Sequence, residues 1–239
     1  MRFSFLNNLL NIVYPARCPI CGEIISKRGR DICPECEVRL TYVEEPICLK
    51  CGKPVSGEEQ EYCSDCLNKN HLFKEGRSVL VYDEHASKSI YAFKYNARGE
   101  YAKFYGRIIY ERLGRKIRSW KPDVIIPVPI HSSKLKQRGY NQAALIAKEL
   151  SKRLNIPMDE RLIVRKNQTK VQKNLSAKDR EINLKKAFNV TRNSVELKSV
   201  LVVDDIYTTG STMDAIAGCL EGAGIREVYF VTLCIGRGI

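Results

Sequence analysis

The sequence predicts a small cysteine-rich domain followed by an α/β domain, whose sheet is mainly parallel and flanked by helices. Two observations predict this arrangement. Eight of the ten cysteines lie between Cys18 and Cys66, in a chain of 239 residues. From Arg77 onward, apolar runs of strand length alternate with segments of helical periodicity, as in sheets built from strand–helix–strand units. We therefore expect domains at 1–76 and 77–239.

At the N-terminus, apolar residues are interrupted by Asn7, Asn8 and Asn11, and Pro15 follows. This pattern predicts a short amphipathic helix rather than a signal peptide or a transmembrane segment, and no longer apolar run follows. We therefore expect a cytoplasmic protein. In that compartment thiols stay reduced, and paired cysteines bind metal more often than they form disulfides.

The clustered cysteines form four CxxC pairs with eleven residues between successive pairs, and the pattern repeats after 30 residues. Two CxxC turns supply the four thiolates that zinc prefers in closed structural sites, which leave no open position for catalysis. The repeat predicts two structural Zn²⁺ ions in a double zinc ribbon. Their ligands would be Cys18, Cys21, Cys33 and Cys36 in one site, and Cys48, Cys51, Cys63 and Cys66 in the other. A cross-braced pairing stays open.

Charge is divided unevenly along the chain, whose net charge is +13. Residues 1–76 hold 10 Lys and Arg against 11 Asp and Glu, whereas 77–239 hold 30 against 16. The cysteine region is therefore a poor direct ligand for DNA, and we expect a metal-dependent scaffold or a protein-docking surface. The basic second domain favours polyanionic partners. His71, after the last clustered cysteine, could be a spare metal ligand, but with eight cysteines present it is expected at the surface.

The second domain is expected to contain these elements. In chain order they are a strand at 77–82, helices at 87–95 and 101–113, a strand at 123–128, a helix at 141–154, a strand at 200–203, a helix at 211–222 and a strand at 227–235. The two central strands are continuously apolar, as buried parallel strands are. Tyrosines at 91, 95, 101 and 105 could stack on nucleic-acid bases, but their helical spacing favours a packed helix face.

The most informative motif follows the strand at 200–203, where ligands bind on parallel sheets. Asp204 and Asp205 stand at the tip of this strand, and a loop of small residues leads into the next helix. Backbone N–H groups, the helix dipole and hydroxyl groups make such a loop a cradle for a phosphate monoester. The loop consists of Thr208, Thr209, Gly210, Ser211 and Thr212. Adjacent carboxylates suit a vicinal diol with a divalent metal nearby, so the motif predicts a ribose 5-phosphate.

This motif resembles the signature of type I phosphoribosyltransferases, which bind phosphoribosyl pyrophosphate (PRPP). The resemblance implies a type I phosphoribosyltransferase-like sheet and Mg²⁺ bound with PRPP. It also implies that Asp204 and Asp205 hold the ribose hydroxyls in the catalytic site, and that the loop 208–212 holds the 5-phosphate. Tyr207 stands where the family usually has an aliphatic residue.

A second element agrees with a PRPP site. Pro129, Ile130 and His131 follow the strand at 123–128, and a basic turn continues to Arg138. Positive charge at the end of a neighbouring strand is where a pyrophosphate is expected. His131 as a general acid and Arg138 are weaker candidates for catalysis, and a solvated basic loop is the alternative.

The third element is a long polar segment. Between Arg161 and Lys198 there are 11 basic and 3 acidic residues, which is more charge than one PRPP requires. Loops of this length are usually lids or disordered. The candidate nucleic-acid ligands are Arg165, Lys166, Lys170, Lys173 and Arg180.

Together, these motifs resemble the ComF family of competence proteins. The resemblance is carried by CPICG near the N-terminus, PVPIH after a strand, RGYNQ where the family usually has RGFNQ, the polar segment, and VVDDIYTTGST. It implies a role in natural transformation, with uptake of single-stranded DNA alongside a companion helicase, in the cytoplasm or at the inner face of its membrane.

Three functions stay open at this point. The first is a competence protein that binds PRPP and single-stranded DNA, for which the +14 domain supplies sequence-independent affinity. The second is a Mg²⁺-dependent phosphoribosyltransferase acting on a base or amine. The third is a non-catalytic PRPP sensor that regulates transcription or uptake. Neither the acceptor nor the oligomeric state can be predicted from the sequence.

Overall fold

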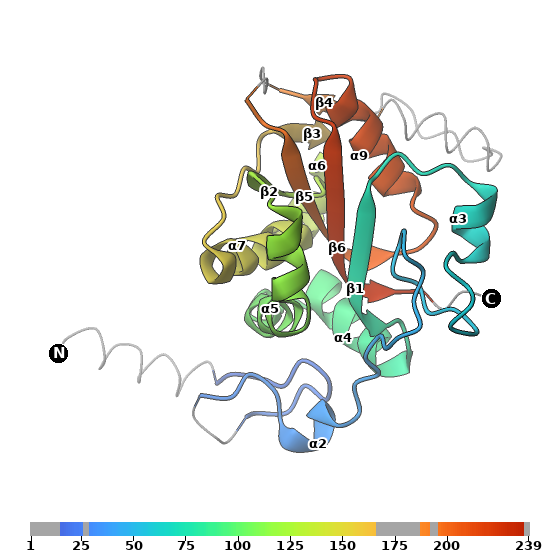
Figure 1. Cartoon of the computed structure of the whole chain (residues 1–239). Helices are drawn as coiled ribbons and strands as arrows, with labels where there is room; N and C mark the ends of the chain where they lie inside the picture. Colours follow the sequence, from blue (N-terminus) through green and yellow to red (C-terminus); the bar gives the residue numbers. More distant parts are fainter. Residues whose placement is uncertain (1–14, 26–28, 166–186, 192–195, 237–239) are drawn as a thin grey trace, which may run out of the picture.

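The computed structural model of the chain describes residues 15–25, 29–165, 187–191 and 196–236. Four parallel strands form the central sheet in the order β1-β6-β5-β2 (Figure 1). These strands are β1 Glu75–Val81, β2 Val124–Pro127, β5 Ser199–Tyr207 and β6 Glu227–Ile235. A separate antiparallel pair consists of β3 Ile163–Arg165 and β4 Phe188–Val190. The predicted α/β class is confirmed.

Helices cover both faces of the sheet because β5 is apolar on both sides. Leu201 and Val203 pack into a core with three helices, while Val200 and Val202 point to the opposite face. The three helices are α4 Glu84–Tyr95, α5 Tyr101–Trp120 and α7 Gln142–Leu154. The opposite face carries α9 Ser211–Glu221 and the β3–β4 pair.

The two halves of the cysteine region pack on opposite faces of the sheet. The first half contains α2 Pro34–Glu37 and shares a core with α4 and α5, and the second contains α3 Ser64–Asn68 and shares a core with α9 (Figure 1). Between them, the segment 41–43 pairs with β1 through a bridge from Tyr42 to Leu80. This segment covers the edge of β1 that would otherwise be open.

Several predicted boundaries shift. β1 begins at Glu75, and β5 continues through the acidic pair to Tyr207, so the carboxylates belong to the strand itself. The predicted basic turn is a short helix, α6 Ser132–Arg138. The domain division at 76/77 stays a prediction.

The predicted N-terminal helix before Pro15 lies outside the described residues. Within the residues that are described, no helix has both the length and the apolar character to cross a membrane.

Candidate functional site

The clustered cysteines form two groups of four. In each group all the sulfur atoms lie within 4.8 Å of one another. Cys18, Cys21, Cys33 and Cys36 form the first group and Cys48, Cys51, Cys63 and Cys66 the second, which is the consecutive arrangement and not the cross-braced one. Four thiolates at this spacing fit a closed tetrahedral zinc site.

The two groups are built by the same turn. The N–H of Gly22 donates to the carbonyl of Cys18, and that of Gly52 donates to Cys48, both at 2.9 Å. Both glycines have positive φ, 78° and 77°, so the backbone reverses after each CxxC pair. The 30-residue repeat in the sequence is thus a repeat in structure.

A polar cavity of about 150 Å³ lies at the carboxyl end of β5. It joins the acidic pair, the segment after β2 and the last residue of the loop 208–212. It is lined by Lys94, Val128, Pro129, Ile130, Lys134, Arg138, Asn141, Gln142, Ala143, Arg165, Asp204, Asp205 and Thr212. The structure therefore brings together residues from all three elements that the sequence singled out.

Two cations face the acidic pair inside this cavity. Lys94 Nζ lies 2.8 Å from Asp205 Oδ2. Burial raises the pKa of Asp204 to about 8, with a further rise from the charge of Asp205, while Lys94 and Arg165 act in the opposite direction. Burial lowers the pKa of Arg165, which the charge of Asp204 partly offsets. The carboxyl oxygens of the pair can accept hydrogen bonds from a diol, and the two cations favour the ionised form of Asp204.

Lys94 was not among the predicted site residues. It lies in the last turn of α4, where a lysine is usually solvated, and only the strand order brings that turn to the end of β5. The one signal in the sequence was that Lys94 is a basic residue in the last turn of a helix that directly follows a strand.

The loop 208–212 forms the N-terminus of α9. Gly210 has φ +77° and precedes the helix, and its carbonyl accepts from the N–H of Asp214 at 2.8 Å. The hydroxyls of Thr209 and Ser211 lie 3.1 Å apart. A Cβ atom at Gly210 would lie 2.7 Å from both His71 Cε1 and Tyr207 Oη, so glycine is required here by space as well as by conformation.

His71 was predicted at the surface, and this prediction is wrong. Its side chain is fully buried, with Nδ1 2.8 Å from Asp214 Oδ2 and its ring stacked on Phe73 at 4.8 Å. Asp214 lies 143 positions away in the sequence, so local spacing carried no signal for this contact.

Helix α6 places Lys134 and Arg138 in the lining of the cavity, whereas His131 does not belong to that lining. His131 precedes the helix and its Nδ1 accepts from the N–H of Ser133 at 3.2 Å, so this nitrogen caps the helix. Arg138 donates to Gln142 Oε1 at 2.9 Å and to Tyr95 Oη at 3.1 Å, with its guanidinium 4.9 Å from the Tyr95 ring centroid. Arg138 is thus held at the mouth of the cavity by a partner on each side.

The expectation for the four tyrosines is half right. Tyr101 and Tyr105 are buried against the sheet. Tyr91 and Tyr95, by contrast, are 61% and 48% exposed, and their ring centroids lie 4.9 Å apart. With Arg138 over Tyr95, these two rings form an exposed aromatic surface, which we call the Tyr91–Tyr95 platform.

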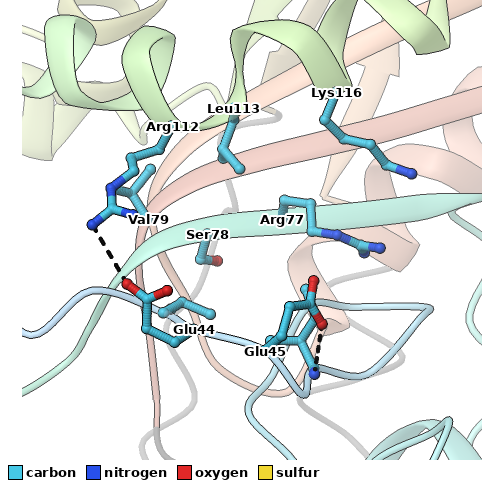
Figure 2. A pocket seen from close by; sticks show the side chains of 10 residues that line it. Glu44, Glu45, Arg77, Ser78, Val79, Arg112, Leu113 and Lys116 are labelled. Atoms are coloured by element: carbon cyan, nitrogen blue, oxygen red, sulfur yellow. Dashed lines mark hydrogen bonds and ion pairs between the residues drawn. The ribbon is translucent and has the colours of Figure 1, made fainter.

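A larger cavity of about 350 Å³ lies between the segment after the first cysteine group and α5 (Figure 2). Figure 2 shows Glu44 pairing with Arg112, and the two groups lie 3.4 Å apart. The carboxylate of Glu45 accepts from the backbone N–H of Ile47. The nearby Lys116 pairs with Glu75. Because these charges neutralise one another, the cavity does not require a charged ligand.

Most of the predicted nucleic-acid residues cannot be placed. Lys166, Lys170, Lys173 and Arg180 lie outside the described residues. Arg165 is described and lies in β3 beside the acidic pair, with its guanidinium 5.7 Å from the Phe188 ring centroid.

Comparison with known proteins gives matches over nearly the whole chain. The double zinc ribbon domain family matches residues 9–67, and the phosphoribosyl transferase domain family matches residues 102–238. The chain is 34% identical to Competence protein F of Haemophilus influenzae over 219 residues, which cover 89% of this chain and 93% of that protein. It is 30% identical to DNA utilization protein YhgH of Escherichia coli over 226 residues, or 93% and 98% of the two chains. It is 27% identical to Competence protein ComFC of Bacillus subtilis over 204 residues, or 83% and 81%.

Proposed function

This chain belongs to the family of the competence proteins F and ComFC, and from that premise we propose that it binds PRPP at the end of β5 and handles single-stranded DNA during uptake into the cytoplasm. The PRPP part of the proposal rests on two neighbouring groups at the carboxyl end of β5. There, an acidic pair for a diol stands next to a loop for a phosphate, with Thr212 shared between the loop and the cavity.

In this proposal each part of PRPP has its own group of ligands. The ribose hydroxyls donate hydrogen bonds to Asp204 and Asp205. The 5-phosphate accepts hydrogen bonds from the N–H groups and hydroxyls of the loop 208–212. Lys134 and Arg138 lie in α6, which follows the neighbouring strand β2. They line the same cavity and bind the pyrophosphate. The carboxylate oxygens of the acidic pair also fit Mg²⁺, which would neutralise pyrophosphate charge when bound with PRPP.

The DNA part is supported by the Tyr91–Tyr95 platform. Exposed aromatic rings stack on unpaired bases of any sequence, and Arg138 adds a cation over one ring. The platform adjoins the cavity through Arg138, which contacts Tyr95 and lines the cavity. The net charge of +14 on 77–239 supplies affinity for phosphates. A companion helicase is the expected partner in uptake.

A second candidate function is phosphoribosyl transfer to a base. The same platform favours it, because a stacked nucleobase at the cavity mouth would be near the ribose carbon that releases pyrophosphate. A regulator that senses PRPP without transfer would use the same ligands and release no pyrophosphate.

Calorimetry with PRPP and Mg²⁺ tests the first part. The variants Asp204→Asn and Asp205→Asn should lose binding, because each replaces a carboxyl oxygen that accepts from the ribose hydroxyls by an amide NH2 group, whereas Glu84→Gln, at an exposed carboxylate on α4, should not. Unchanged affinity in both aspartate variants would place the ribose elsewhere.

Fluorescence anisotropy with single-stranded DNA tests the second part. Affinity should fall steeply with salt, neutralising Lys166, Lys170 and Lys173 together should flatten that slope, and Tyr91→Ala should weaken binding at every salt concentration. Weak binding that is insensitive to salt would refute the DNA part. A pyrophosphate-release assay against bases, nucleotides and DNA ends then separates transfer from sensing.

A further inference from the structure

The segment that leaves the second cysteine group contacts the loop 208–212, which we call the phosphate loop after its proposed ligand. Helix α3 starts after Cys63 and ends at Asn68, and Lys69 follows it in extended conformation. The ammonium nitrogen of Lys69 lies 3.3 Å from the hydroxyl of Ser211 and 3.6 Å from Asp214 Oδ2. Lys69 comes from the cysteine region, whereas Ser211 belongs to the loop 142 residues later.

Asp214 ties this segment to the first turn of α9. Its two carboxylate oxygens face three groups of the segment: Nδ1 of His71 at 2.8 Å, the N–H of Leu72 at 3.0 Å, and the ammonium group of Lys69. The aspartate is buried, so these contacts are shielded from water and hold the segment in place.

The floor of the loop comes from the same segment and from the end of β5. His71 and Tyr207 lie under Gly210, and Nε2 of His71 and Oη of Tyr207 are both buried without a hydrogen-bond partner in the described structure. Two unpaired polar atoms beneath the loop, together with a lysine at its edge, distinguish this helix N-terminus from an ordinary one.

The charge of the expected ligand favours a cation at this place, in addition to the N–H groups and the helix dipole. A phosphate monoester carries a charge of about −1.5 to −2 at neutral pH. The five residues 208–212 provide hydroxyl and N–H donors but no cation, and Asp214 adds a negative charge nearby. Lys69 is within reach of the Ser211 hydroxyl, and its side chain is 31% exposed, so a ligand can approach it from solvent.

We propose that Lys69, supplied by the segment after the second cysteine group, binds the 5-phosphate in the loop 208–212, and that Asp214 is the positioning residue that holds it there. This inference rests on the proposed PRPP site. It gives the cysteine region a direct part in ligand binding, in addition to its scaffold role. A lysine acts on phosphate as a strong point charge through a charge-assisted hydrogen bond.

Calorimetry on the full, zinc-loaded chain with two separate probes tests the inference. Lys69→Ala should weaken binding of ribose 5-phosphate about tenfold or more, and should leave inorganic pyrophosphate within about twofold. Lys69→Arg should recover most of the affinity. Lys74→Ala is the matched control, because this lysine lies five residues later, is paired with Glu227 and is 53% exposed against 31% for Lys69. Lys69→Gln provides a second neutral variant should the alanine variant fold poorly.

The outcomes separate the inference from the proposed function. If Lys69→Ala and Lys69→Gln bind ribose 5-phosphate as well as the original chain while Asp205→Asn loses PRPP, the inference is overturned and the PRPP site stands. Equal losses for both probes, or equal losses in Lys74→Ala, would show a general electrostatic effect and would also overturn it. If the original chain binds neither probe, the proposed function fails as well.

Discussion

Replacing Gly210 by alanine tests how the cysteine region supports the phosphate loop. At φ +77° an alanine costs about 1 kcal/mol through backbone strain alone. Its Cβ would also lie 2.7 Å from His71 Cε1 and from Tyr207 Oη, and overpacking of a buried site costs about 1–3 kcal/mol. Together the two effects predict a loss of about 2–4 kcal/mol in the free energy of unfolding, or about 4–16 °C in melting temperature for a chain of this size.

Thermal melts of the zinc-loaded protein followed by circular dichroism measure this loss. Gly224→Ala is the matched control, because Gly224 has φ +90° with nothing within 4 Å of the added Cβ, so strain alone should lower its melting temperature by about 2–4 °C. If the two variants lose the same amount, the contact of His71 and Tyr207 with the loop is not the cause, and the reasoning is refuted.

Tyr207→Phe provides an independent check. The Tyr207 hydroxyl is buried without a partner in the described structure, and such a group costs about 1–3 kcal/mol, so its removal should leave stability unchanged or raise it. Because the hydroxyl is also one of the two atoms that an alanine at 210 would meet, the double variant should recover part of the loss. Strict additivity of the two changes would contradict this packing.

Three further predictions concern the metal, the first cysteine group and the acidic pair. Metal analysis should find about two zinc ions per chain, and one or none would contradict two closed sites. Arg107→Ala removes a guanidinium that contacts both carboxylate oxygens of Asp31 at 2.7–3.1 Å, and should lower stability by about 1–2 kcal/mol with faster hydrogen exchange around the first cysteine group. The control Glu111→Gln, at the exposed partner of Arg107, should change stability by less than about 0.5 kcal/mol, and an equal effect would refute the assignment. Burial raises the pKa of Asp204 in the folded chain to about 8, against about 4 in the unfolded chain. The folded state is therefore favoured most below about pH 4, and this part of the stability is lost as the pH rises to about 8. Asp204→Asn should therefore gain melting temperature relative to the original chain from pH 5 to pH 9, and a constant difference across that range would contradict the raised pKa.

The parts of the protein that could be predicted from sequence share one property, which is that their signals are local. The CxxC pairs repeat at a fixed spacing, and metal coordination allows few other arrangements of eight thiolates. The strand, acidic pair, loop and helix at 200–222 are continuous in the chain, so their chemistry could be deduced without a fold. Their roles in ligand binding stay predictions.

The parts that sequence reasoning missed are assembled from distant segments. Lys94 meets Asp205 only because β1 and β5 are separated by one strand, and strand order cannot be deduced from periodicity. Lys69 and His71 meet α9 across more than 140 residues. Helical spacing favoured a packed face for all four tyrosines, but Tyr91 and Tyr95 are exposed on α4, where only the side chain of Arg138 is recorded over the Tyr95 ring among the described residues. In each case the deciding contact is tertiary.

The placement of the two cysteine groups on opposite faces of the sheet has a consequence for how the protein responds to zinc supply. Without metal, a closed four-thiolate unit does not hold its fold, and each face of the sheet would lose part of its covering. Loss at the second group would also release the segment under the phosphate loop. If the proposed PRPP site holds, a shortage of zinc would therefore impair PRPP binding together with stability.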